Sequence, residues 1–268
     1  MKLSFNWILP EKWQKINVPS EIILKSFSEI RLNAEFGSVR TFKVEKRDLE
    51  LEIVELKKKF KFNIEQQLPR NEFEVCKSSA DIIKRMRELS FDIDTVANKI
   101  ELKVPEKNSH SEISAVNACG FAAYDDDGLH FLFKIKGAKH FDASHSADIW
   151  KGSCMQFALN GMRLKQPYAL SFAAAKTSAG MAVFDFFTGK FTGKMNFNWK
   201  NNGEAQYYYL CVPWNVLNFS RVPVGKKISF SVTYNNCDGK EFAGYLEWTK
   251  GVCGGVSPNE YGDLVICS

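Results

Sequence analysis

Apolar and polar residues alternate over short segments in the first quarter of this chain. A period of two residues is typical of β-strands with one face in solvent, because successive side chains point to opposite faces of a sheet. The apolar or alternating segments are residues 3–7, 22–24, 30–32, 49–53 and 60–64. Pro10 places a turn over residues 9–13. This part of the chain is therefore predicted to form an antiparallel β-sandwich.

A longer series of strand segments follows residue 120. The segments are residues 121–124, 129–135, 155–159, 168–174, 181–187, 206–212, 228–234, 245–248 and 263–266. Residues 125–128, Asp-Asp-Asp-Gly, predict a hairpin turn between the first two, because Asp and Gly tolerate the backbone angles of such turns. Many short strands with almost no helix predict a second β-sandwich of the jelly-roll kind.

The pattern changes near residue 70, where we place a domain boundary. Residues 78–81 lead into residues 82–89, which predict a short helix capped by Ser78 or Ser79. A length of 268 residues also exceeds the roughly 100–200 typical of one domain. We expect an all-β protein of two antiparallel sandwich domains, residues 1–72 and 73–268.

Composition and charge argue against several classes of function. Aromatic residues make up 13% of the chain against only 4 histidines, which favours a binding protein over His-dependent catalysis. Of the net charge of +5, +4 lies in residues 1–70, where residues 57–61 are the densest basic run. That run lies in an alternating segment and indicates a solvated strand, so we expect no nucleic-acid partner. No apolar stretch reaches the ~18 residues of a membrane span, and none is expected.

Motifs for catalysis, nucleotides and metals are weak. The chain has no Gly-x-Ser-x-Gly elbow, and the glycines of residues 251–255 do not open a helix, so we expect no enzyme. Residues 125–127 could offer calcium ligands, and His140, Asp142 and His145 could hold a metal, but a turn and a solvated loop are the preferred interpretations. Seven cysteines cannot all pair within one chain, and the pairing of any disulfide stays open.

Aromatic and amide side chains remain as candidates for a ligand-binding site. A sugar offers an apolar C–H face and a rim of hydroxyls, so its site needs a flat aromatic ring and planar polar groups. Trp150 and Gln156, six residues apart across a predicted turn, supply both. A tryptophan near a strand is also typical of a core, and that alternative stays open.

Several segments after residue 120 resemble, in order, the motifs of family 9 carbohydrate-binding modules. The resemblance rests on residues 122–131 (an aromatic–Asp turn and strand), 148–157 (a Trp-x-Gly element and strand), 212–217 (Pro-Trp-x-x-Leu), 225–230, and 246–248 followed by Pro258 and residues 261–264. It covers roughly residues 75–268. Ser153 departs from the family pattern, in which Asp is frequent, and Gln156 stands where Glu is common.

The resemblance implies a β-sandwich that binds glycans without cleaving them, with a sugar held between two tryptophans. Trp150 and Trp248 would be the platforms and Gln156 the hydroxyl partner, while Trp214 would be structural. We expect no cofactor, with calcium as the alternative because it is common in the family. The partner would be a poly- or oligosaccharide.

Further expectations concern the setting of this module. Residues 1–72 are similar in pattern to the Ig-like domains that precede such modules in glycoside-processing proteins. A catalytic domain outside this chain and an extracellular or cell-surface location would follow. Two alternatives stay open: a haem-binding sandwich of the DOMON type with Met155, Met162, Met181 or His145 as ligands, and a purely structural sandwich without ligand.

Overall fold

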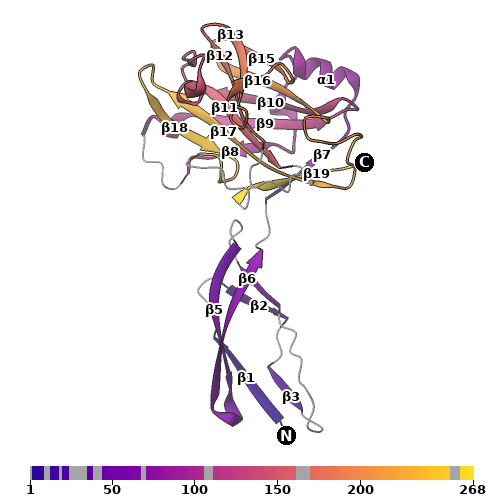
Figure 1. Cartoon of the computed structure of the whole chain (residues 1–268), viewed down its shortest axis with the longest axis vertical. Helices are drawn as coiled ribbons and strands as arrows, with labels where there is room; N and C mark the ends of the chain where they lie inside the picture. Colours follow the sequence, from indigo (N-terminus) through magenta and orange to yellow (C-terminus); the bar gives the residue numbers. More distant parts are fainter. Residues whose placement is uncertain are drawn as a thin grey trace. The chain divides into compact units, whose positions relative to one another are not determined.

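The chain divides into two compact units, Met1–Arg70 and Asn71–Ser268. The computed structural model, drawn in Figure 1, describes residues 2–8, 13–17, 20–23, 35–38, 44–67, 71–105, 111–160, 170–253 and 260–268. The second unit begins directly before its first strand, β7 (Glu72–Val75). The boundary predicted at residue 72 therefore falls two residues later than the change of units, at the start of this strand.

The first unit is built from antiparallel strands. They form sheets in the orders β3-β1-β5-β6 and β2-β4. Their bounds are β1 Lys2–Ile8, β2 Trp13–Asn17, β3 Glu21–Ile23, β4 Glu35–Ser38, β5 Val44–Ile53 and β6 Lys58–Gln67, with the 3₁₀ turn η1 at Val54–Leu56. The expected strand at residues 30–32 and most of the turn at 9–13 lie outside the described residues.

Alternation explains the described strands of the first unit. Leu3, Phe5 and Trp7 of β1 are buried and Asn6 is exposed, as the period of two predicts. The lysines of residues 57–61 are exposed along the β6 end of the sheet, and Lys61 pairs with Glu50 at 2.9 Å. They are thus a solvated strand, as predicted. The Ig-like character of this unit stays a prediction.

The second unit is a sandwich of two sheets, which confirms the predicted all-β class. Five strands run in the order β15-β16-β10-β9-β8, and a larger sheet has the order β14-β13-β12-β11-β17-β19-β7, with β18 also paired to β17. The strands are β8 Ile100–Leu102, β9 Asn117–Tyr124, β10 Gly128–Lys136, β11 Cys154–Asn160, β12 Leu170–Thr177, β13 Gly180–Asp185, β14 Lys190–Phe191, β15 Asn196–Asn201, β16 Ala205–Pro213, β17 Lys227–Cys237, β18 Phe242–Glu247 and β19 Gly262–Ile266.

Local signals account for most of these strands. The hairpin predicted over residues 125–128 joins β9 and β10, with the Asp125 carboxylate accepting from the backbone N–H groups of Asp127 and Gly128 at 2.9 and 3.1 Å. One pairing differs from the expected antiparallel pattern: β7 and β19 run parallel. These strands come from opposite ends of the unit, so no local turn could have indicated their contact.

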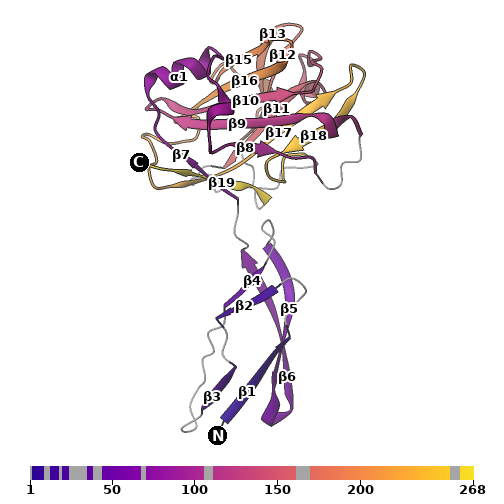
Figure 2. The same ribbon diagram turned by 180° about the vertical axis from the view of Figure 1, so that it is seen from behind.

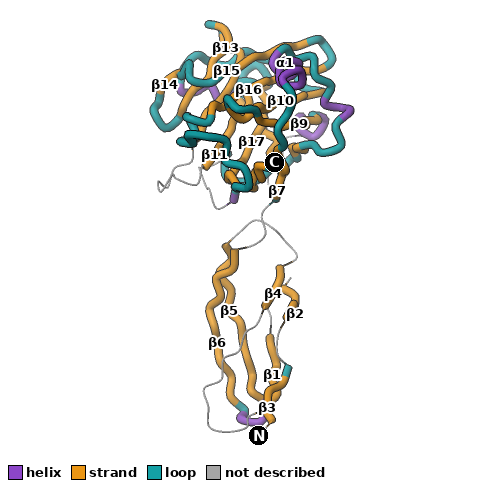
Figure 3. The backbone as a smooth tube through the Cα atoms, turned by 90° about the vertical axis from the view of Figure 1, so that its right-hand side faces the viewer, coloured by secondary structure: helices purple, strands orange, loops and turns teal. Residues whose placement is uncertain are grey.

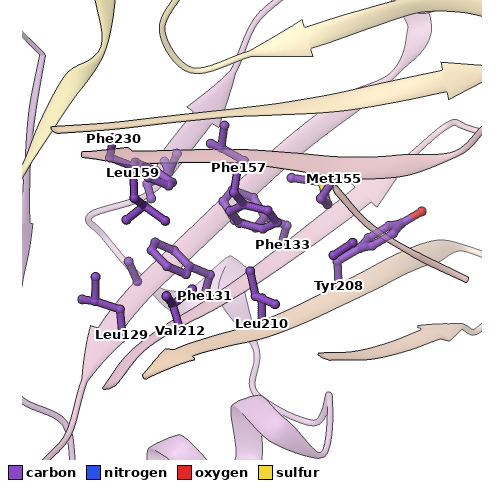
Figure 4. Packing of buried hydrophobic residues seen from close by; sticks show 14 of the residues in the cluster. Leu129, Phe131, Phe133, Met155, Phe157, Leu159, Tyr208, Leu210, Val212 and Phe230 are labelled. Atoms are coloured by element: carbon purple, nitrogen blue, oxygen red, sulfur yellow. The ribbon is translucent and has the colours of Figure 1, made fainter. Parts of the chain in front are cut away.

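Apolar side chains from both sheets fill the space between them. Figure 4 shows Phe131 of β10 facing Phe157 of β11 and Phe230 of β17. The Phe131 ring lies 5.0 Å from that of Phe230 and 5.7 Å from that of Phe157, measured between centroids. These aromatic contacts hold the two sheets face to face, as in other sandwiches.

Helix α1 (Ala80–Arg87) covers the outer face of the five-stranded sheet (Figures 1 and 2). Ser79 is its N-cap, as predicted, with its hydroxyl accepting from the Ile82 N–H at 3.4 Å. Ile83 and Met86 are buried against residues such as Leu132 and Tyr209 of the sheet. The remaining short helices are η2 Ile93–Thr95, η3 Ser111–Ala115 and η4 Ala147–Lys151 (Figure 3), and no described helix could span a membrane.

Candidate functional site

Three neighbouring strands of the larger sheet carry a row of polar side chains on its outer face. In the strand register, Gln156 of β11 lies opposite Thr233 of β17, and Thr233 lies opposite Glu247 of β18. The residues next to them along the strands, such as Phe157 and Val232, belong to the sandwich core. Because side chains alternate along a strand, Gln156, Thr233 and Glu247 point away from that core. We call these three residues and Asn235 the polar row.

Apolar clusters lie on both sides of the polar row. On one side Ala143 and Ile149 cover Cys154 of β11 and its neighbours in β12 and β13. On the other side Val252 and Tyr261 cover Ala158. Between these clusters, Gln156 and Glu247 each have a relative solvent exposure of 8%. The polar row therefore lies between two apolar patches of the outer face.

Asn235 connects the polar row to Trp150. Its side-chain amide donates to the backbone carbonyl of Trp150 at 2.7 Å, at the end of η4. Gly152 comes two residues later. A Cβ added to it would lie 2.5 Å from the Ala143 Cα, so only glycine fits at this position. These contacts fix the backbone of Trp150 against the sheet.

Trp150 begins a series of three partly buried aromatic rings. Its ring meets that of Phe242 edge to face at 5.8 Å, and Phe242 stacks with Tyr245 at 6.3 Å, between centroids. Lys151 Nζ lies 5.5 Å from the centroid of the Trp150 ring. Tyr245 lies opposite Asn235 in the strand register, which places its side chain on the same face as the polar row. We call Trp150, Phe242 and Tyr245 the aromatic rim.

The Cys253 thiol lies beside the polar row. Its sulfur is 3.7 Å from Thr233 Oγ1, 3.7 Å from Asn235 Oδ1 and 3.9 Å from Gln156 Oε1, so three acceptors face one donor. Burial raises the pKa of this thiol to about 11, against the hydrogen bond with Thr233. The thiol therefore stays protonated at neutral pH and can donate.

Glu247 carries an unusual carboxyl group. Burial raises its pKa from 4.5 to about 7, with Lys250 opposing the shift and Glu260 adding to it. The pKa of neighbouring Tyr245 is raised to about 12, mainly by burial and further by Glu247. Near neutral pH, Glu247 is present both as an acceptor-only carboxylate and as an acid that can also donate.

The three residues predicted for the site do not come together as expected. Trp150 and Gln156 lie at the same face and are connected through Asn235 and Cys253. Trp248 follows Glu247 and points the other way: its ring packs against Phe230 at 5.5 Å and belongs with the sandwich core.

Alternation along the strand explains the position of Trp248. Its indole Cη2 lies 2.7 Å from where a Cβ would stand on Gly262, so only glycine fits beneath the ring. The expected clamp of Trp150 and Trp248 is not the arrangement of this structure. Trp214 is buried and its indole N–H donates to the Asp125 carbonyl at 3.0 Å, which confirms its structural role.

Four residues that complete the site carried no predicted binding role. Asn235, Phe242, Tyr245 and Glu247 come from β17 and β18, whose segments were predicted as strands. One signal was present: polar residues 229, 231, 233 and 235 alternate with apolar residues 228, 230, 232 and 234. That pattern indicates a polar face on β17, although it does not show which residues of β18 join it.

The other candidate ligands occupy separate places. His140 hydrogen-bonds Gln206 and Asp142, at 3.1 and 3.0 Å, and its ring lies against Trp199. Among the residues that the structure describes, no three His, Cys, Asp or Glu side chains form a cluster suited to a metal. All seven cysteines are thiols.

Of the residues proposed as haem ligands, His145 and Met181 lie together, while Met155 lies apart from them. Met155 is fully buried in the sandwich core. His145 and Met181 line a separate hollow of about 440 Å³, together with apolar residues such as Phe191 and Phe197. Met162 lies outside the described residues.

Comparisons with known proteins identify the fold. No family model matches the sequence, and no curated protein matches it significantly. Solved structures do match: a family 9 carbohydrate-binding module from Caldicellulosiruptor kristjanssonii in complex with cellotriose has a TM-score of 0.56 at 12% identity, covering 74% of this chain and 94% of the module. The same kind of module in complex with glucose has a TM-score of 0.53 at 13% identity, covering 73% and 95%.

A third structure extends the comparison to another organism. It is a Bacteroides uniformis protein described as carbohydrate-binding, with a TM-score of 0.53 at 13% identity, covering 73% of this chain and 98% of that protein. At these identities the likeness concerns the fold. The chain thus contains the β-sandwich fold of the family 9 carbohydrate-binding modules.

Proposed function

We propose that the second unit binds a saccharide at the aromatic rim and the polar row, without catalysing a reaction on it. One observation carries this proposal: the rings of Trp150, Phe242 and Tyr245 stand beside Gln156 and Glu247 on one face of the sheet. The fold supports it, because neighbours with the same fold were solved with cellotriose and glucose and are binding modules.

The chemistry of the site suits a sugar ring. An aromatic ring can stack on the apolar C–H face of a sugar, and this contributes on the order of 0.5–1.5 kcal/mol beyond burial. Hydroxyl groups at the edge of the sugar need acceptors and donors, which the Gln156 amide and the Glu247 carboxyl supply. Few such contacts predict an affinity in the micromolar to millimolar range.

The biological setting is part of the same proposal. The chain would act as an accessory region of a glycoside-processing protein, outside the cell or at its surface, with the first unit as an Ig-like support. The catalytic partner would be a domain that acts on the same polysaccharide. Cell fractionation with an antibody against this chain tests the location, and recovery only from the cytosol would contradict it.

Calorimetry against a panel of soluble oligosaccharides tests the binding function. The panel begins with cellotriose and glucose and includes β-1,3-, β-1,4- and α-1,4-linked glucans, xylans and mannans. Trp150→Ala is expected to weaken binding at least about tenfold, because it removes both the stacking and the buried apolar area. Phe187→Ala is the matched control, since Phe187 is an aromatic residue with 59% exposure that follows β13.

Two outcomes count against the proposal. Equal binding by the wild type and Trp150→Ala would remove the aromatic rim as the site. A folded wild-type protein that binds no saccharide of the panel would contradict the binding function and favour a structural role for the sandwich.

A further inference from the structure

The first and last strands of the second unit lie side by side and bring two cysteines together. The parallel pairing of β7 and β19 runs from Glu72 opposite Asp263 to Val75 opposite Ile266. The next residue in each strand is a cysteine, Cys76 and Cys267. The Cys267 N–H donates to the Val75 carbonyl at 2.9 Å, so the pairing extends to this point.

Tyr124 fixes the backbone of both cysteines. Its backbone N–H donates to the Cys76 carbonyl at 3.2 Å, and its phenolic hydroxyl donates to the Cys267 carbonyl at 2.6 Å. Tyr124 itself is buried at the end of β9. One rigid residue thus holds the two chain segments in position relative to each other.

The strand register places the two side chains next to each other on one face. Residues in register on neighbouring strands point to the same face, and strands lie about 4.8 Å apart, within the separation that a disulfide spans. The Cys267 thiol donates to the Val265 carbonyl at 3.6 Å. Its pKa is raised, first by burial and further by Glu74 and the neighbouring Cys76 thiol. Cys76 is exposed and Cys267 is partly exposed, so an oxidant in solution can reach the pair.

We propose that Cys76 and Cys267 form a redox modification site whose oxidised state is a disulfide between the first and last strands of the second unit. The oxidant is a small-molecule disulfide such as oxidised glutathione. The Cys76 thiolate attacks one of its sulfur atoms, and one molecule of thiol leaves. The Cys267 thiolate then attacks the Cys76 sulfur and releases the second. The protein loses two electrons and two protons, and the oxidant leaves as two thiols.

The position of the Cys76–Cys267 disulfide determines how it would stabilise the second unit. β7 lies at the end of the larger sheet and has β19 as its neighbour there. It is also the strand with which the chain enters the second unit. A bond from Cys76 to Cys267 would close a ring around nearly the whole sandwich, which restricts the unfolded chain and prevents β7 from separating.

Selectivity follows from exposure: of the seven cysteines, all of which the structure describes, Cys76 is exposed and the other six are partly exposed or buried. Cys154 and Cys211 are buried, and burial raises the pKa of both, that of Cys211 to about 12. Cys119 is partly exposed, and its pKa is raised by burial and by the Asp94 carboxylate, with Lys99 opposing the shift. Small-molecule disulfides react with thiolates that they can reach, so Cys76 is the expected point of attack.

The test uses the full chain with oxidised glutathione and, in parallel, with a reducing agent. Digestion without reduction, followed by mass spectrometry, is expected to yield a peptide pair joined through Cys76 and Cys267, with two titratable thiols lost. The oxidised protein is expected to melt about 5–15 °C higher than the reduced one. Cys76→Ser and Cys267→Ser each lose both signals, and the control Cys119→Ser keeps them.

Three results would overturn the proposal: seven thiols still titratable after prolonged oxidation, glutathione retained on Cys76 of the wild type, or a linkage between other cysteines. The reduced variants are compared with the reduced wild type by circular dichroism and melting temperature. Equal values show that the serine substitutions leave the fold intact, so that loss of the shift reports the missing bond. None of these readouts depends on a saccharide.

Discussion

The buried carboxyl of Glu247 makes the stability of the second unit depend on pH. Burial raises its pKa from 4.5 to about 7. The folded state therefore binds this proton more tightly than the unfolded state does, and stability falls as the pH rises from about 4.5 to about 7. Below that range the group costs nothing, and above it the full penalty of a buried charge is present.

The size of this effect follows from the two pKa values. At ~1.4 kcal/mol per pH unit, the difference between 4.5 and about 7 corresponds to about 3 kcal/mol in the free energy of unfolding. Glu247→Gln keeps the shape of the side chain and carries no charge at any pH. The variant is expected to be about 3 kcal/mol more stable than the wild type near pH 8 and about equally stable near pH 4.5.

Urea unfolding at several pH values measures this difference. Tryptophan fluorescence follows the second unit, which holds Trp150, Trp199, Trp214 and Trp248 of the six tryptophans. The wild type and Glu247→Gln are compared at each pH, so that the titration of all other groups cancels. Glu241→Gln, at an exposed position before β18, is the control. A stability difference that stays constant between about pH 4.5 and 8 would show that the pKa of Glu247 is the same in the folded and unfolded states.

Three substitutions test the packing of the second unit. Trp248→Ala is expected to cost about 2–4 kcal/mol by urea unfolding and to leave saccharide affinity unchanged, whereas lost affinity with full stability would contradict its place in the core. Gly120→Ala would set a Cβ 2.2 Å from the Phe133 ring and cost about 1–3 kcal/mol in thermal unfolding, and an unchanged melting temperature would oppose this. Ser79→Ala removes the cap of α1 and costs about 1 kcal/mol, seen as faster hydrogen exchange in the helix; unchanged exchange would contradict the cap.

Strands and turns were predictable because their signals are local. The Asp and Gly residues of 125–128 indicate a turn, and Ser79 indicates the N-cap of α1. The parallel contact of β7 with β19 joins residues nearly two hundred positions apart and depends on the packing of the whole sandwich. No local pattern specifies it, and the closeness of Cys76 and Cys267 was therefore invisible in the sequence.

The site was predictable only in part, because the sequence does not show which face of a strand each residue occupies. Trp150 and Gln156 were identified from chemistry and motif, and the structure places both at one face. Trp248 was selected because it is a tryptophan in a matching motif, but shifting a strand by one residue exchanges its two faces. Here Glu247 takes the outer position and Trp248 the inner one. Residue type suggested the ligand class, and only the backbone shows which side chains can reach it.

A crystal structure of the protein with the tightest-binding oligosaccharide would locate the binding site. We expect a sugar ring stacked on the aromatic rim, in contact with the Trp150 ring, with hydroxyl groups hydrogen-bonded to Gln156 or Glu247. A sugar bound at another surface, such as the hollow lined by His145 and Met181, would show that the aromatic rim and the polar row are not the site.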